Sequence, residues 1–221
     1  MTSRTVHLAV YDTFADWETG YTTAHLAQNG YTVRTVGLSL EPVTTMGGLR
    51  VQPDLALDEL RPQDSALLIL TGATAWDTGG TLAPFARSAH AFLGAGVPVA
   101  AICGATAGLA REGLLDDRAH TSAVSFYLAA TGYGGGARYV AADAVTDGGL
   151  VTAGPTEPVA FAREVFGLLG VYGPKKLDAW YRLFHDSDAS AYEVLAGEDT
   201  EGTEATGEER AGGTGDRGAG A

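Results

Sequence analysis

Two short apolar runs place the strongest constraint on how this chain can fold. Residues 66–72 read ALLILTG and residues 97–102 read VPVAAI, with almost no polar side chain to face water. Strands with this pattern are buried on both faces, as happens when helices cover both sides of a parallel sheet. Over residues 1–196, similar short apolar runs alternate with longer amphipathic segments. This alternation is typical of βα units, so we expect an α/β fold around a mainly parallel sheet.

The same patterns predict the individual strands and helices. We expect strands at 6–12, 31–38, 66–72 and 97–102, with further strands within 139–152 around Gly148 and Gly149. Amphipathic spacing predicts helices at 17–30, 83–96, 157–170 and 175–186. Residues 43–60 predict a small hairpin that turns at Gly47 and Gly48 and leads into a short helix.

Composition separates a domain, residues 1–196, from a tail, residues 197–221. The tail holds eight glycines, seven acidic residues, two arginines and no large apolar residue, which predicts a disordered acidic segment. The 221-residue chain has a formal net charge of −13, so its surface repels polyanions and we expect no nucleic-acid partner. No apolar run approaches the ~18 residues of a membrane span, and the N-terminus lacks a signal-peptide pattern. We therefore expect a cytoplasmic protein without a membrane partner.

Cys103 is the one cysteine of the chain, and the five histidines are scattered. No CxxC or HxxxH cluster is present, so we expect neither a disulfide nor a metal. Cys103 is then either a small buried apolar residue or a nucleophile. In VPVAAICGATAGLA, an apolar strand ends at Ile102, the thiol occupies the bend, and small residues open a helix. Such an elbow presents a nucleophile to substrate, and the helix N-terminus is expected to lower the thiol pKa.

Two other segments follow predicted strands. Gly72 and Ala73 come at the end of the apolar run 66–72, at the edge where parallel sheets bind ligands. The backbone N–H groups of Ala73 and Gly104 would then point at one spot and hold an oxyanion, although a turn that merely needs glycine has the same pattern. Glu18 follows the first strand, where a carboxyl group is either a solvated acid of a first helical turn or part of the site.

These segments, AICGATAGLA, ILTGAT and ADWET, resemble the ThiJ/PfpI superfamily in order and spacing over residues 5–170. The resemblance implies a class I glutamine amidotransferase-like domain, a flavodoxin-like three-layer sandwich. It also implies that Cys103 is the nucleophile, that Glu18 hydrogen-bonds its sulfur, and that the amides of Ala73 and Gly104 form an oxyanion pocket beside Gly72. Members are often homodimers, so a homodimer is expected, although the sequence itself shows no clear interface.

Several residues depart from well-known branches of that superfamily. The branch described as intracellular proteases has His after the cysteine and the isonitrile hydratase branch has Thr, whereas this chain has Gly104. Residues 152–161 include Glu157 but no histidine, so a glutaminase triad is not evident. The pattern is most similar to members with a Glu and Cys pair and a small residue after the cysteine. These are associated with glyoxalase-type hydration of 2-oxoaldehydes, deglycation and thiol redox sensing.

Two more residues are candidates for the pocket. His120 lies 17 residues after Cys103, where the resemblance places a pocket-lining strand. Its imidazole would accept or deliver a proton near neutral pH, although a structural histidine fits as well. Trp76 follows the oxyanion segment and either walls the pocket or packs in the core. The other four histidines have no comparable context.

We therefore expect an enzyme with a Cys103 nucleophile that acts on a small-molecule electrophile such as an aldehyde, an amide carbonyl or an isonitrile. No cofactor is expected, because the glycine pair of GGLRVQ, residues 47–52, belongs to a hairpin and not to a phosphate loop. One alternative is a non-enzymatic redox sensor or chaperone-like stress protein with an oxidisable cysteine. The others are an amidase, peptidase or glutamine amidotransferase-like protein, and a ligand-binding or regulatory protein with a vestigial elbow.

Overall fold

The computed structural model describes residues 4–78 and 80–197. The predicted tail, residues 197–221, lies outside the described residues apart from Gly197 and stays a prediction. A seven-stranded sheet has the order β5-β2-β1-β6-β7-β9-β8. Its strands are β1 (Thr5–Ala9), β2 (Thr32–Gly37), β5 (Leu55–Ala56), β6 (Leu67–Leu70), β7 (Val99–Ile102), β8 (Ala144–Asp147) and β9 (Leu150–Ala153).

Parallel pairing dominates this sheet. Strand β1 is parallel to β2 and β6, β6 to β7, and β7 to β9, whereas the edge strand β8 is antiparallel to β9. The two apolar runs form β6 and β7, which are neighbours at the centre of the sheet, and every residue of both strands is buried. The predicted α/β fold with a mostly parallel sheet is confirmed.

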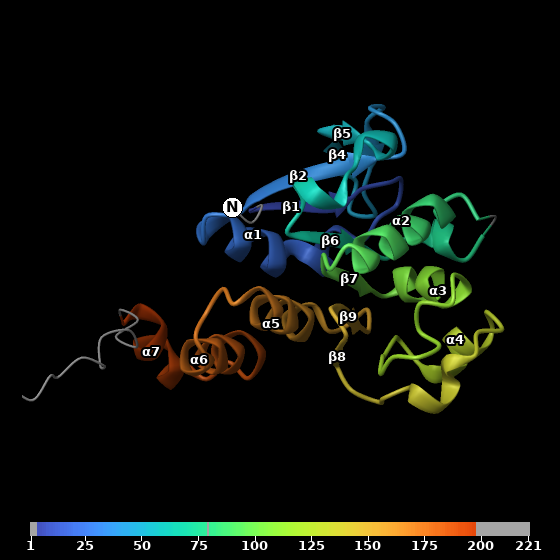
Figure 1. Cartoon of the computed structure of the whole chain (residues 1–221). Helices are drawn as coiled ribbons and strands as arrows, with labels where there is room; N and C mark the ends of the chain where they lie inside the picture. Colours follow the sequence, from blue (N-terminus) through green and yellow to red (C-terminus); the bar gives the residue numbers. More distant parts are fainter. Residues whose placement is uncertain (1–3, 79, 198–221) are drawn as a thin grey trace, which may run out of the picture.

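Helices cover both faces of the sheet and complete three layers (Figure 1). On one face, α1 (Gly20–Gln28) packs against α5 (Pro158–Leu169), and α6 (Pro174–His185) packs on α5. On the other face lie α2 (Ala83–Gly94) and α3 (Gly104–Arg111). The short helices are α4 (Ser125–Ala129) and α7 (Tyr192–Ala196), with 3-10 turns η1 (Asp16–Thr19), η2 (Leu57–Glu59), η3 (Pro62–Asp64), η4 (Thr74–Trp76), η5 (Gly135–Arg138) and η6 (Ala189–Ala191). Among the described residues, no helix has the length and apolar character needed to span a membrane.

Two glycine turns form hairpins: the hairpin predicted around Gly47 and Gly48, and one at Gly148 and Gly149, around which strands were predicted. Strands β3 (Val43–Thr44) and β4 (Arg50–Val51) pair antiparallel around the turn that contains Gly48, whose φ is 85°. Strands β8 and β9 pair with Asp147 opposite Leu150, so the turn consists of Gly148 and Gly149, with φ of 56° and 82°. A two-residue hairpin turn with both residues at positive φ favours glycine strongly, which explains the pair.

Two expected elements start differently in the structure. The helix expected at 17–30 begins as the 3-10 turn η1 and becomes α-helical at Gly20, because the N–H of Glu18 donates to the carbonyl of Ala15 three residues earlier. Instead of a strand from 139, the chain makes the 3-10 turn η5 and a single bridge between His120 and Tyr139 before β8 begins. Apolar spacing does not separate a 3-10 turn from an α-helical one, so the sequence pattern missed both starts.

The helix expected at 175–186 is present as α6 and packs inward. Trp180 is only 1% exposed, and its ring lies 4.9 Å from that of Phe166 on α5 and 5.2 Å from that of His25 on α1. The apolar face around Trp180 is therefore used largely within the chain. Phe184, at the end of the same face, is 36% exposed.

Substituting Gly108 tests how closely α3 packs on η4. A Cβ atom at Gly108 would lie 2.2 Å from Cζ3 of Trp76. Alanine is normally the better helix former by up to ~1 kcal/mol, yet we expect Gly108→Ala to lower the free energy of unfolding by about 1–3 kcal/mol because the tryptophan must move. Urea unfolding measures the change. Gly94→Ala in α2, where a Cβ meets nothing within 4 Å, is the control; equal stability of both variants would contradict the close packing.

Candidate active site

The carboxyl ends of the parallel strands bring the predicted site residues to one edge of the sheet. Glu18 follows β1, Gly72 and Ala73 follow β6, and Cys103 follows β7. Because these three strands are adjacent and parallel, the segments that leave them start side by side. Residues separated by up to 85 positions in sequence thus meet by topology alone.

Cys103 occupies a strained turn between β7 and α3. Its φ of 58° and ψ of −128° lie in a region that non-glycine residues rarely adopt, which costs about 1–3 kcal/mol. Hydrogen bonds hold the turn on both sides. The N–H of Cys103 donates to the carbonyl of Ala153 at 3.0 Å, and its carbonyl accepts from the Thr106 hydroxyl at 2.6 Å. Cys103 is partly exposed, so the predicted elbow is present at the surface of the site.

Glu18 is fully buried next to this elbow, which excludes the solvated alternative. Its Oε2 accepts a hydrogen bond from the Gly72 N–H at 2.7 Å. Its Oε1 is buried without a partner of standard hydrogen-bond geometry. A Cβ atom at Gly72 would lie 2.7 Å from Oε1 of Glu18 and 2.8 Å from Sγ of Cys103, so both groups close around this glycine. Gly72 is therefore needed for the carboxyl and the thiol to approach each other.

The carboxyl and thiol alter each other's ionisation. Burial raises the pKa of Glu18, and the hydrogen bonds from Gly72 and Cys103 oppose this rise. Burial, followed by the Glu18 charge, raises the pKa of the Cys103 thiol to about 12, while the Gly104 N–H acts in the opposite direction. This direction is contrary to the lowering expected from the helix N-terminus, because burial and the adjacent carboxylate outweigh the helix. At low pH the carboxyl and the thiol hold one proton each. Once the first proton has left, the pair shares the remaining one, which leaves only at high pH.

The two residues predicted to supply oxyanion donors, Ala73 and Gly104, line the same cavity as Cys103. Ala73 is fixed by a bridge to Phe14, in which the N–H of Ala15 donates to the carbonyl of Gly72 at 2.9 Å. In the described part of the chain, the Ala73 N–H itself donates no hydrogen bond. The Gly104 N–H lies close enough to the Cys103 sulfur to lower the pKa of the thiol. Two amides therefore remain near the thiol, as an oxyanion pocket requires.

A cavity of about 290 Å³ opens over Cys103. It contains both reactive side chains and the two proposed amide donors. Its lining residues are Ala15, Trp17, Glu18, Met46, Gly72, Ala73, Thr74, Asp77, Cys103, Gly104, Ala123, Tyr127 and Pro155. The volume suits a small molecule better than a folded protein segment.

The order of these segments is that of a known family. The sequence matches the DJ-1/PfpI family over residues 4–167. The chain belongs to the DJ-1/PfpI family. The resemblance predicted from three short motifs over residues 5–170 is confirmed over nearly the same span.

Individual relatives agree with the assignment. "Uncharacterized protease YoaZ" of Bacillus subtilis (strain 168) is 40% identical over 193 residues, which cover 83% of this chain and 91% of the relative. "Deglycase TK1284" of Thermococcus kodakarensis is 29% identical over 159 residues, covering 72% and 95%. The crystal structure of the thiJ/pfpI family protein from Bacillus anthracis matches with a TM-score of 0.84 at 37% identity, covering 89% of this chain and 97% of that one. The flavodoxin-like sandwich of this DJ-1/PfpI family member is thereby confirmed.

His120 lies outside the cavity lining. It is fully buried, with Nδ1 bonded to the carbonyl of Arg118 at 2.8 Å and Nε2 to the Tyr133 hydroxyl at 3.0 Å. Both ring nitrogens are thus occupied, and its ring also contacts Tyr139. The expectation that His120 faces the pocket is not met, because residues 118–120 run toward η5 instead of lining the cavity with β7. We favour the structural alternative for this histidine.

Trp76 packs behind the elbow and is absent from the cavity lining. It is 4% exposed, and its Nε1 donates to the carbonyl of Thr71 at 2.8 Å and to the Tyr11 hydroxyl at 3.1 Å. Its ring lies against Gly108 of α3. The indole therefore positions the segment that carries Ala73, and the core alternative of the sequence analysis describes it better than a pocket wall.

Two ionisable residues of the lining were not predicted. Asp77 ends η4, and Tyr127 on α4 donates its hydroxyl hydrogen to Oδ1 of Asp77 at 2.7 Å. The only sequence signal for Asp77 is its place four residues after Ala73. Tyr127 carries no signal, since it reaches the cavity through a loop and a short helix.

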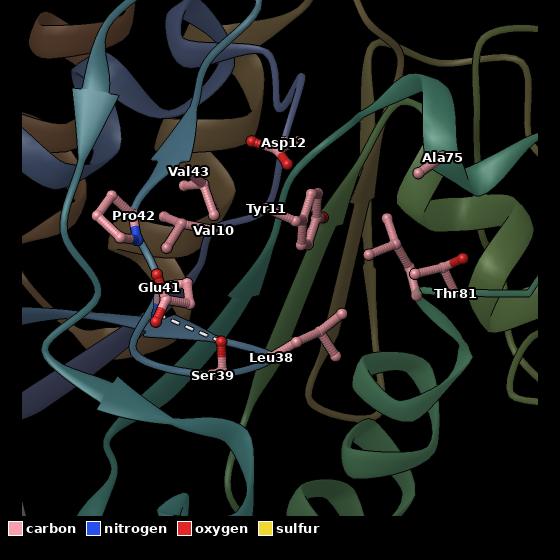
Figure 2. Close-up of a pocket in the computed structure, with 11 residues that line it drawn as sticks. Val10, Tyr11, Asp12, Leu38, Ser39, Glu41, Pro42, Val43, Ala75 and Thr81 are labelled. Carbon is pink, nitrogen blue, oxygen red and sulfur yellow. Dashed lines mark hydrogen bonds between the residues drawn. The ribbon is translucent and has the colours of Figure 1, made fainter.

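A second cavity, of about 240 Å³, lies at the same sheet edge beyond β1 and β2 (Figure 2). Tyr11, Leu38 and Thr81 converge on it from different segments. The 3-10 turn η4 separates the two cavities, because Thr74 lines the first and Ala75 the second. No sequence pattern indicated this space.

One group of metal-ligating atoms lies elsewhere. Donor atoms of Asp143, Glu157 and His185 lie within 4.8 Å of one another. Asp143 and His185 are exposed, and His185 also pairs with Asp186 at 2.6 Å. None of these residues is among those that line the Cys103 cavity.

Removing the Glu18 charge tests the pairing of carboxyl and thiol. We expect Glu18→Gln to move the upper ionisation of Cys103 to lower pH by about one to three units, because the carboxylate no longer opposes the thiolate. The pH dependence of Cys103 alkylation by iodoacetamide measures this. Asp117→Asn removes a charge from an exposed position outside the cavity and is the control. If the two variants titrate alike, Glu18 does not control the sulfur.

Proposed function

We propose that this protein is a cysteine-dependent enzyme that acts on small electrophilic carbonyl compounds, with glyoxalase-like or deglycase-like chemistry. The observation that carries the proposal is the buried Glu18 carboxyl beside the strained, accessible Cys103 in a cavity of about 290 Å³. A structural cysteine needs neither a carboxyl neighbour nor a strained backbone.

The shared proton explains how a thiol with a raised pKa still reacts. When the proton moves from Cys103 to Glu18, the sulfur becomes a thiolate and the carboxyl becomes neutral. The raised pKa of Glu18 makes the carboxyl a better base for this transfer than an exposed glutamate. Glu18 then acts as the general base for attack and keeps the proton available for the product.

The attack itself uses the two backbone amides. The Cys103 sulfur forms a bond to the carbonyl carbon, and the electron pair of the C=O bond moves to the oxygen. The N–H groups of Ala73 and Gly104 stabilise this negative charge by hydrogen bonds. Glu18 supplies its proton to the oxygen or to a leaving group, which returns the carboxylate to its starting state.

The make-up of the cavity favours this chemistry over a triad mechanism. The described residues that line the cavity include no histidine, which a peptidase or glutamine amidotransferase triad would place beside the sulfur. Among the relatives, two are named uncharacterized proteases and one is named a deglycase. The Glu and Cys pair without histidine supports the second kind of reaction for this chain.

Turnover assays with matched variants test the proposal. Methylglyoxal, glutamine, a simple isonitrile and a short peptide are offered to the purified chain, and we expect conversion of methylglyoxal. Cys103→Ala abolishes it, and Glu18→Gln lowers kcat/KM by about 10²-fold through loss of the general base. His120→Asn is the control and keeps activity to within a few fold, because His120 lies outside the cavity.

Other outcomes point to the alternatives. Conversion of glutamine or peptide alone would overturn carbonyl chemistry in favour of an amidase. Absence of turnover, together with selective oxidation of Cys103 by peroxide to a sulfinic acid, would favour the redox sensor. Equal activity of wild type and Cys103→Ala would reject the nucleophile.

A further inference from the structure

We propose that the Cys103 cavity selects its substrates by charge, with Asp77 as the selecting residue, and that it takes neutral or cationic electrophiles and rejects anionic ones. This inference rests on the proposed function and names the substrate class of the same site. Amine-bearing carbonyl compounds fit this class, whereas 2-oxo acids and phosphorylated aldehydes do not.

The charges of the lining carry the argument. The described lining residues include two carboxylic acids, Glu18 and Asp77, and no lysine, arginine or histidine. Glu18 is fully buried beside the sulfur, whereas Asp77 is exposed at the outer part of the cavity. An entering molecule therefore meets an exposed carboxylate, and an anion gains no compensating cation from the described lining residues.

The geometry of Asp77 keeps its charge directed at the cavity. Tyr127 donates to Oδ1 at 2.7 Å, and the N–H of Asp77 donates to the carbonyl of Thr74 at 3.1 Å. Oδ2 has no hydrogen-bond partner among the described residues. One carboxylate oxygen is thus anchored and the other is available to a bound cation.

The effect of Asp77 reaches the reacting atom. Its negative charge contributes to the raised pKa of the Cys103 thiol. Arg111 keeps its charge while its Nη1 donates to the carbonyl of Trp76 at 2.8 Å, but it forms no ion pair with Asp77 in the described part of the chain and is not among the charges that shift the pKa of the thiol. The two charges that raise the pKa of the thiol, those of Glu18 and Asp77, are therefore both negative.

The cavity walls suit an organic cation. Trp17 and Met46, which are 50% and 48% exposed, line the same space. An indole face attracts an ammonium group, and the thioether of methionine adapts to alkyl groups. A small cation would meet Asp77, Trp17 and Met46 together.

Charged thiol reagents test the selection without requiring turnover. Three methanethiosulfonates are used: the cationic trimethylammonium-ethyl, the neutral methyl and the anionic sulfonatoethyl compound. In each case the Cys103 thiolate attacks the sulfenyl sulfur, a disulfide forms and methanesulfinate leaves. Each rate is divided by the rate of 2-mercaptoethanol with the same reagent. This division removes the intrinsic differences in reactivity among the three reagents.

In the wild type, we expect the relative rate to be highest for the cationic reagent, lower for the neutral one and lowest for the anionic one. Asp77→Asn lowers the ratio of cation to anion rates by about three- to tenfold, as loss of one nearby unit charge predicts. Asp117→Asn makes the same change of net charge outside the cavity and is the matched control. Tyr127→Phe keeps the Asp77 charge but removes its anchor, so we expect it to weaken the selection less than Asp77→Asn does. Added salt weakens the selection in the wild type.

The outcomes separate this inference from the proposed function. Equal ratios for Asp77→Asn and Asp117→Asn overturn the selection by Asp77, whatever the enzyme converts. Charge selection that is lost in Asp77→Asn, in a protein that converts no carbonyl compound, supports the selective cavity and rejects the enzyme. Circular dichroism of each variant confirms that the fold is retained, and since Asp77 is exposed its replacement leaves the core intact.

Discussion

The site depends on the close approach of the backbone at Gly72 to the side chain of Cys103. No Cβ fits between them, and the Gly72 N–H also binds Oε2 of Glu18. One glycine thus fixes the distance between the carboxyl and the sulfur and leaves the next amide, that of Ala73, near the thiol. The parallel pairing of β6 with β7 creates this approach, so the fold itself builds the site.

The strain at Cys103 is balanced by contacts on the far side of the elbow. Thr106 bonds the Cys103 carbonyl, and its hydroxyl lies 2.7 Å from that of Ser122. Trp76 packs against Gly108 and holds η4 in place. None of these residues lines the cavity, yet their contacts support the turn that carries the thiol.

The features predicted correctly are those that depend on residues adjacent in the sequence. The apolar runs of β6 and β7, the bend at Cys103 and the glycine hairpins each follow from local pattern and covalent geometry. Glu18 was placed by family resemblance, and its burial could not be read from a first-turn acid alone. His120 and Trp76 were misjudged as pocket candidates because their surroundings come from distant segments. Asp77, Tyr127 and the raised thiol pKa depend on the same long-range packing.

The shared proton of Glu18 and Cys103 has a consequence for how the site meets its surroundings. Between the first and the second ionisation, the pair keeps a constant charge, and only the position of the proton within the pair varies. The fraction of thiolate is then an internal tautomeric ratio that bulk acidity does not change. In the proposed mechanism, the pH of the solution therefore does not set the reactivity of the Cys103 nucleophile over this range, whereas the reactivity of an isolated cysteine follows the pH.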